Sequence, residues 1–148
     1  MMTAKNSMGA GEGKSTCALN SNQVLAMVVI GVVFWFSGAM GVKLGSPLGI
    51  FGPVASAFAF ATAFPVSWFG VLVAAKVGKL GPDQIIPGIA VGTVASTFCD
   101  GIALTWFRWL YGTDPEQVVL GAAWILWGAG AFFAAAFFEA HRQRTKVK

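Results

Sequence analysis

The sequence has little charge and few of the side chains on which most enzyme chemistry depends. Of its 148 residues only 11% are charged, whereas soluble domains contain about 25% charged residues. It contains one histidine, His141, and two cysteines, Cys17 and Cys99, which stand far apart in unlike surroundings. Such a set provides neither a zinc site, nor a disulfide, nor a Ser–His or Cys–His pair, nor an imidazole ligand for haem. We therefore predict a non-enzymatic protein with no catalytic residue, metal site or cofactor.

Apolar side chains are correspondingly abundant, at 56% of the residues. A soluble domain of this size could not bury so much apolar surface, so lipid is the expected solvent for most of the chain. The net charge is +4, but the polar segments are too short to form a folded basic face. This excludes nucleic-acid binding and indicates contact with membrane lipids.

Four long apolar runs organise the chain. Together they predict an all-α, polytopic membrane protein, a four-transmembrane-helix bundle that occupies residues 23–139. A polar, glycine-rich and serine-rich segment, 1–22, precedes it as a flexible tail, and a basic tail, 140–148, follows it. The spans are expected at about 24–44, 54–75, 85–107 and 118–138.

Two other interpretations of the N-terminal region are weaker. Gly9–Thr16 resembles a phosphate-binding loop, but Met8 stands where that motif requires glycine, and no strand precedes it. The first apolar run could also be a cleaved signal peptide, although it exceeds the 7 to 15 residues usual for one. We expect a retained first span.

Lysine and arginine are distributed unequally between the two sides of the predicted bundle. Eight of the ten lie in the N-terminal segment, the second loop and the C-terminus, which four spans place on one side. Only Lys43 and Arg108 fall on the other side. The positive-inside rule then predicts that both termini are cytoplasmic, in a bacterial inner membrane.

Small residues and aromatic residues indicate how the helices pack and end. Gly41 and Gly45, like Gly88 and Gly92, have GxxxG spacing, and with Gly31 they are expected to let helices approach closely. Trp106, Trp109 and Tyr111 are typical of an aromatic belt at the membrane interface. Asp114 is a predicted N-cap, followed by Pro115 at the first position of the fourth helix.

One acid, Asp100, lies well inside the third predicted span, where an ionisable side chain is costly. Thr93, Ser96 and Thr97 precede it at spacings that place all four on one helical face. Three roles remain open for Asp100: a proton or cation site in a transport path, a hydrogen-bonded link between helices, and a contact with another subunit. We favour the link, because no clear basic partner accompanies the acid.

Residues from the other spans are expected at the depth of Asp100. They are Ser37, Thr62, Trp124 and Trp127. We expect an indole N–H or a hydroxyl from this layer to donate to the carboxylate, and Lys43 to extend toward it from the outer rim.

The stretch PGIAVGTVASTFCDGIALTWFRWLYG (Pro87 to Gly112), followed by AAWILWGAGAFFAAAF (Ala122 to Phe137), resembles an uncharacterised family of small bacterial four-span membrane proteins, a domain of unknown function. In that family a proline opens the third span, an aspartate lies near its outer end, and an alanine-rich and tryptophan-rich span follows. Pro87, Asp100 and Trp124 match these positions. The resemblance covers residues 24–138 and implies the fold but no activity.

The leading expectation is therefore an accessory or self-associating membrane subunit that acts through helix packing, as a homo-oligomer or in a larger membrane complex. The alternative is a small transporter or permeation unit that uses Asp100 as its coupling acid. The small multidrug transporters have an essential acid in their first span, and residues 24–44 contain none.

Overall fold

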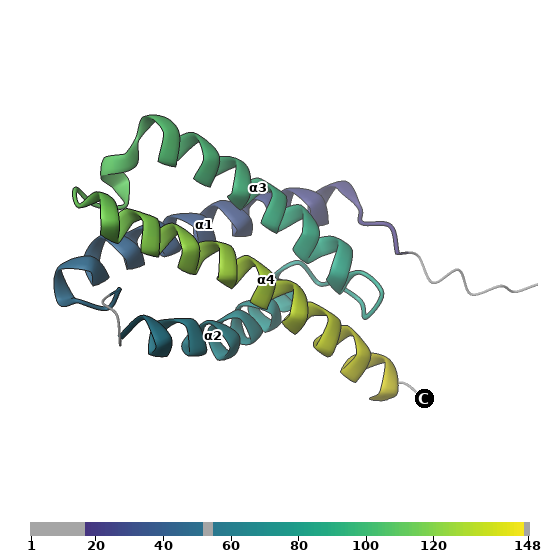
Figure 1. Ribbon diagram of the computed structural model, residues 1–148. Coiled ribbons are helices and arrows are strands. Elements are labelled where there is room, and N and C mark those ends of the chain that lie inside the picture. Colours follow the sequence, from purple (N-terminus) through teal and green to yellow (C-terminus); the bar gives the residue numbers. More distant parts are fainter. Residues whose placement is uncertain (1–16, 52–54, 147–148) are drawn as a thin grey trace, which may run out of the picture.

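The computed structural model describes residues 17–51 and 55–146, which form four long helices and two short ones (Figure 1). The long helices are α1 (Ser21–Gly45), α2 (Ala55–Val77), α3 (Ile85–Trp106) and α4 (Pro115–Lys146). The short ones are the 3-10 helices η1 (Ser46–Leu48) and η2 (Arg108–Leu110). All four long helices are long and apolar enough to cross a membrane. This confirms the predicted all-α bundle of four spans.

The helix ends follow from capping residues in the sequence. Asn20 accepts a hydrogen bond from the Gln23 backbone, and the Gln23 side chain accepts one from the Asn20 backbone, so α1 begins at Ser21. Asp114 caps α4 by accepting a bond from the Glu116 N–H at 2.9 Å, and Pro115 is the first helical residue, as predicted.

The structure describes more of the C-terminal polar segment than of the N-terminal one. Helix α4 continues without interruption to Lys146, so most of the predicted basic tail forms its last turns. Residues 1–16 of the predicted N-terminal tail, including the glycine-rich Gly9–Thr16 segment, lie outside the described residues, as do 147–148.

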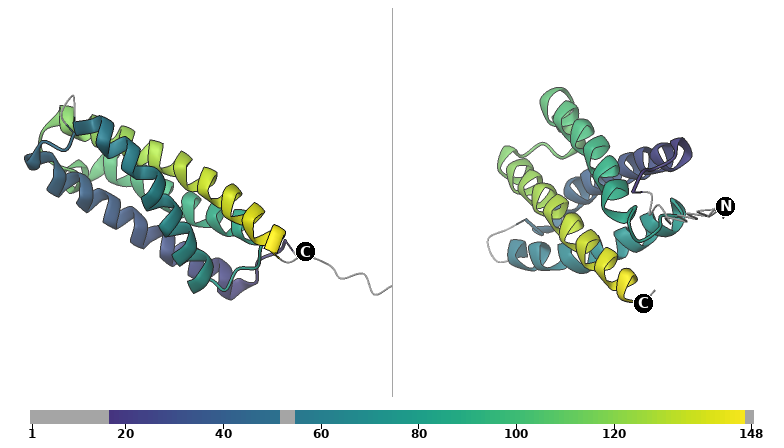
Figure 2. Two further views of the ribbon diagram at one scale, coloured as in Figure 1. Left: turned by 90° about the horizontal axis from the view of Figure 1, so that it is seen from below. Right: turned by 90° about the vertical axis from the view of Figure 1, so that its right-hand side faces the viewer.

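The helices pack mainly as two pairs, α1 with α3 and α2 with α4, and α3 and α4 join the pairs (Figures 1 and 2). Helix α1 crosses α3 where Gly31 meets the backbone of Gly92, and a methyl group on Gly31 would collide with the Gly92 carbonyl oxygen. Glycine is therefore required at this crossing. The prediction that Gly41 lets two helices approach closely is wrong, because a side chain there would meet nothing within 4 Å.

Both described ends of the chain lie at the same end of the bundle as the α2–α3 loop (Figure 1). The Gln84 amide donates to the carbonyl of Ala18 at 2.9 Å, and Arg144 forms a salt bridge with Asp83 at 2.8 Å. These contacts connect the start of α1, the loop and the end of α4. The opposite end consists of the reversals around η1 and η2.

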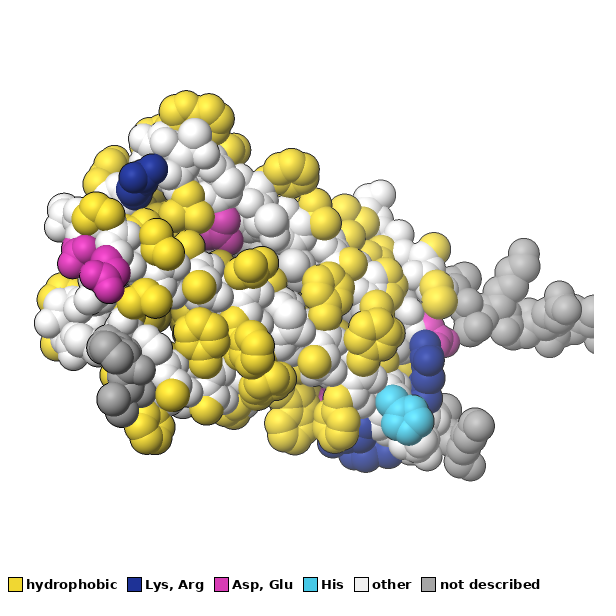
Figure 3. All heavy atoms as spheres, in the orientation of Figure 1, with side chains coloured by type: hydrophobic (Ala, Val, Ile, Leu, Met, Phe, Trp, Pro, Cys, Tyr) yellow, Lys and Arg dark blue, Asp and Glu magenta, His cyan; other side chains and the backbone are white. Residues whose placement is uncertain are grey.

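Few residues of the apolar helices are buried inside the bundle. In the apolar 18-residue stretch of each long helix, only 17 to 28% of the residues are buried. Figure 3 shows hydrophobic side chains over the middle of one face, with lysine, arginine and histidine side chains toward its ends. So much exposed apolar surface requires contact with lipid or with an apolar surface of another protein.

Candidate functional site

Asp100 is the end of a hydrogen-bonded chain that begins on α1. The Trp35 indole N–H donates to the Tyr111 hydroxyl oxygen at 2.9 Å, and the Tyr111 hydroxyl donates to Asp100 Oδ1 at 2.5 Å. Trp35 lies on α1, Asp100 on α3, and Tyr111 directly after η2. We call these three residues the outer relay. It connects α1, α3 and the chain reversal that follows α3.

The outer relay depends on the orientation of Tyr111. The prediction that Tyr111 belongs to an interfacial belt is wrong, because its side chain is fully buried. Trp106 and Trp109 are 70% and 59% exposed, as belt residues should be. The reason is local: η2 turns the chain back over the end of α3, which brings the Tyr111 hydroxyl within reach of Asp100.

Thr93, Ser96 and Thr97 line the same cavity as Asp100, but they do not hydrogen-bond to it. The hydroxyls of Ser96 and Thr97 donate to the Thr93 carbonyl, at 2.9 and 2.8 Å. Hydroxyl side chains inside a helix commonly bond to a carbonyl three or four residues earlier in this way. Ser96 and Thr97 therefore give the cavity wall polar oxygens while their protons are used within α3.

The expectation that an indole of the fourth span donates to Asp100 is wrong. Trp124 donates to the Ala59 carbonyl at 2.8 Å, and Trp127 donates to the Phe60 carbonyl at 3.1 Å. Both indoles point to α2 because α2 is the main packing partner of α4. The indole that reaches the acid, through Tyr111, belongs to Trp35 on α1.

The hydroxyls expected at the depth of Asp100 are also used within their own helices. Ser37 donates to the Val33 carbonyl at 2.8 Å, and Thr62 donates to the Ala59 carbonyl at 2.9 Å. Ser37 nevertheless lines the cavity that contains Asp100.

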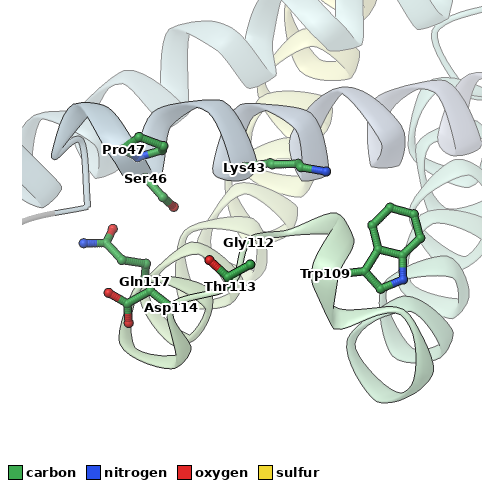
Figure 4. A pocket seen from close by; sticks show the side chains of 8 residues that line it. All are labelled: Lys43, Ser46, Pro47, Trp109, Gly112, Thr113, Asp114 and Gln117. Carbon is green, nitrogen blue, oxygen red and sulfur yellow. The ribbon is translucent and has the colours of Figure 1, made fainter.

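Lys43 does not extend toward Asp100, contrary to expectation. Its ammonium nitrogen lies 5.2 Å from the ring centroid of Trp109, a cation–π geometry. Near the end of α1, a lysine reaches the exposed rim more easily than the interior. There it borders a separate pocket of about 560 Å³ at the end of the bundle opposite the described termini (Figure 4). Ser46, Pro47, Trp109, Gly112, Thr113, Asp114 and Gln117 also line this pocket.

The cavity that contains Asp100 lies between the four helices and has a volume of about 690 Å³. It exists because the helices pack as two pairs with few contacts between α1 and α2. Among the described residues that line it, Asp100 is the only charged one. Its walls are otherwise apolar and aromatic, with hydroxyls from α1, α2 and α3. Its size and composition are those of a small-molecule site.

Glu139 is a fully buried acid that was not singled out from the sequence. Its side chain is fully buried and bonds with both oxygens to Arg142, at 2.8 and 2.7 Å. Gln143 and the Trp68 indole also donate to it, at 2.9 and 3.4 Å. The i, i+3 spacing of Glu139 and Arg142 at the end of an apolar helix was the available signal. This network attaches the end of α4 to α2 and leaves no free carboxylate oxygen for chemistry.

The part of the chain that the structure describes contains no group of three or more histidine, cysteine, aspartate or glutamate residues able to hold a metal ion. Cys17 and Cys99 are free thiols. Comparisons of the chain with known protein families, with curated proteins and with solved structures find no match.

Proposed function

We propose that this chain is a non-enzymatic integral membrane subunit that acts through helix packing, as a homo-oligomer or as an accessory of a larger membrane complex. The observation that carries the proposal is the outer relay. The intramembrane acid, the group from which transport or catalysis would first be suspected, is engaged in connecting α1 to α3. The outward faces of the bundle remain apolar, and such faces suit helix–helix association in lipid.

A bacterial inner membrane, with both termini in the cytoplasm, is part of this proposal. The resemblance of residues 24–138 to small bacterial four-span proteins supports the choice of membrane. Among the described residues, Lys76, Lys79, Arg142, Arg144 and Lys146 gather at the end of the bundle where both described termini lie. This charge distribution supports the orientation.

The second candidate function is a small transporter or permeation unit. It is favoured by the cavity of about 690 Å³, which has Asp100 on its wall. An intramembrane acid beside a cavity is a common feature of proton and cation pathways.

Two substitutions at Asp100 separate the candidates. Asp100→Asn keeps an oxygen that can accept the Tyr111 bond and removes only the charge, whereas Asp100→Ala removes both. Assembly in mild detergent and solute flux driven by a pH gradient are measured for both variants. Glu116→Gln, at an exposed acid in the first turn of α4, is the control for loss of charge.

For the subunit, we expect Asp100→Asn to retain assembly, Asp100→Ala to lose it, and neither to show a specific flux. A flux that Asp100→Asn abolishes in an intact assembly would instead support the transporter. Assembly unaffected by Asp100→Ala would contradict the proposed role of the outer relay.

A further inference from the structure

Among the described residues that line the cavity between the four helices there is one acid and no basic residue. Asp100 projects a carboxylate into it, and the Tyr111 hydroxyl donates to one of its oxygens, Oδ1. The two basic residues at this end of the bundle do not provide a counter-ion. Lys43 lies over the Trp109 ring in the separate outer pocket, and Arg108 does not line the cavity. A carboxylate in apolar surroundings without a cation is unfavourable, so a bound cation would stabilise it.

The other walls of the cavity suit an organic ion better than a small inorganic one. Phe34, Trp35, Trp124 and Phe132 contribute aromatic rings. Aromatic faces attract cations, above all those that shed water easily. A metal ion is usually held by several charged or imidazole ligands, and the described residues that line the cavity include one carboxylate, no histidine and no group of three or more metal-binding side chains.

We propose that this cavity is a binding site for a monovalent organic cation with an apolar body. Asp100 pairs with the charge, and the apolar and aromatic walls cover the body. The inference rests on the second candidate function and names the class of ligand for it. It requires only that the ligand binds, not that it is transported. An anion is disfavoured by Asp100, and a neutral lipid chain would leave the carboxylate unpaired.

The test uses the purified full chain in detergent micelles and tetraphenylphosphonium as the probe. Tetraphenylborate has the same shape and the opposite charge, so it measures partition into detergent and apolar surface. We expect saturable binding of tetraphenylphosphonium at one site per chain and only non-saturable partition of tetraphenylborate. Similar isotherms for the two ions would overturn the inference.

Charge removal gives the second arm of the test. Asp100→Asn, which keeps an acceptor for Tyr111, should weaken tetraphenylphosphonium binding by about tenfold or more. Glu116→Gln removes one negative charge from outside the cavity and should bind as the unsubstituted chain does. Equal weakening by both substitutions would show attraction to net charge alone and overturn the site.

Filling the cavity gives the third arm, which leaves Asp100 in place. Gly128 lines the cavity and Gly130 does not, and a methyl group at either position meets nothing within 4 Å. We expect Gly128→Leu to reduce binding by about tenfold and Gly130→Leu to leave it unchanged. Binding that survives Gly128→Leu in full would place the probe elsewhere.

The outcomes also separate this inference from the proposed functions. Saturable, Asp100-dependent binding without any flux would support the site while the transporter fails. Loss of assembly in Asp100→Ala bears on the subunit proposal and leaves the binding result for Asp100→Asn unaffected.

Discussion

At the scale of single residues, the hydroxyl of Tyr111 has the most demanding position. It donates to Asp100 and accepts from Trp35, and the side chain that carries it is fully buried. Tyrosine suits this position because its ring fills apolar space while its hydroxyl both donates and accepts. The sequence indicates that Asp100 needs a hydrogen-bond donor, and Tyr111 is that donor. The prediction of Trp124 or Trp127 as the donor is wrong, because the direction of the Tyr111 side chain depends on how the chain reverses after α3.

We predict that Tyr111→Phe destabilises the bundle by about 1 to 3 kcal/mol, since the change leaves Asp100 and the Trp35 N–H without their shared partner. Thermal unfolding in detergent, followed by circular dichroism, measures the effect. Trp106→Phe is the control, because Trp106 is 70% exposed. An equal loss in both variants would show that the outer relay contributes no stability.

At the scale of helices, small residues decide which pairs form. The close approach of α1 and α3 depends on Gly31 against Gly92, and that of α1 and α4 depends on Gly121 beside Val42. The sequence shows many glycines in the spans but does not show which of them face another helix. Gly41, with its GxxxG spacing, faces open space, because helix rotation is set by packing along the whole helix.

The glycines of α1 offer a matched test of this packing. We predict that Gly31→Ala destabilises the bundle by about 1 to 3 kcal/mol, because the added methyl collides with a carbonyl that cannot move without shifting α3. Gly41→Ala should be neutral or slightly stabilising, since alanine favours helix and the methyl meets nothing. Unfolding in sodium dodecyl sulfate gives both values. A reversed order of stability would contradict the packing of α1 on α3.

At the scale of the whole molecule, four helices form a bundle whose two ends differ in charge. The end with the described termini is basic and is held together by Gln84 with Ala18 and by Arg144 with Asp83. The other end holds the outer relay, the exposed Trp106 and Trp109, and the pocket beside Lys43. The positive-inside rule predicts the orientation in the membrane from this asymmetry.

Reporter fusions test that orientation directly. Fluorescent protein fused after Lys148 should fluoresce, because it folds in the cytoplasm, and alkaline phosphatase fused there should be inactive. Alkaline phosphatase inserted after Thr113, in the η2–α4 turn, should be active, because that turn is expected outside. The opposite pattern at both positions would invert the predicted topology, and a water-soluble chain would exclude it altogether.

The sequence by itself determined the class of the fold, the number of spans and the start of α4. These follow from apolar length and capping chemistry, which are local properties that survive in any packing. It also indicated that Asp100 would need a partner, because an acid in an apolar span is costly wherever the helices lie.

Only the tertiary structure decided which residues meet. The pairing of α1 with α3, the inward turn of Tyr111, the bonds of Trp124 and Trp127 to α2, and the cavity beside Asp100 all depend on helix rotation and crossing. In lipid, an apolar face packs almost equally well against lipid tails or another helix, so hydrophobicity along the chain does not specify these contacts. Close steric fit and hydrogen bonding specify them, and both exist only once the helices are together.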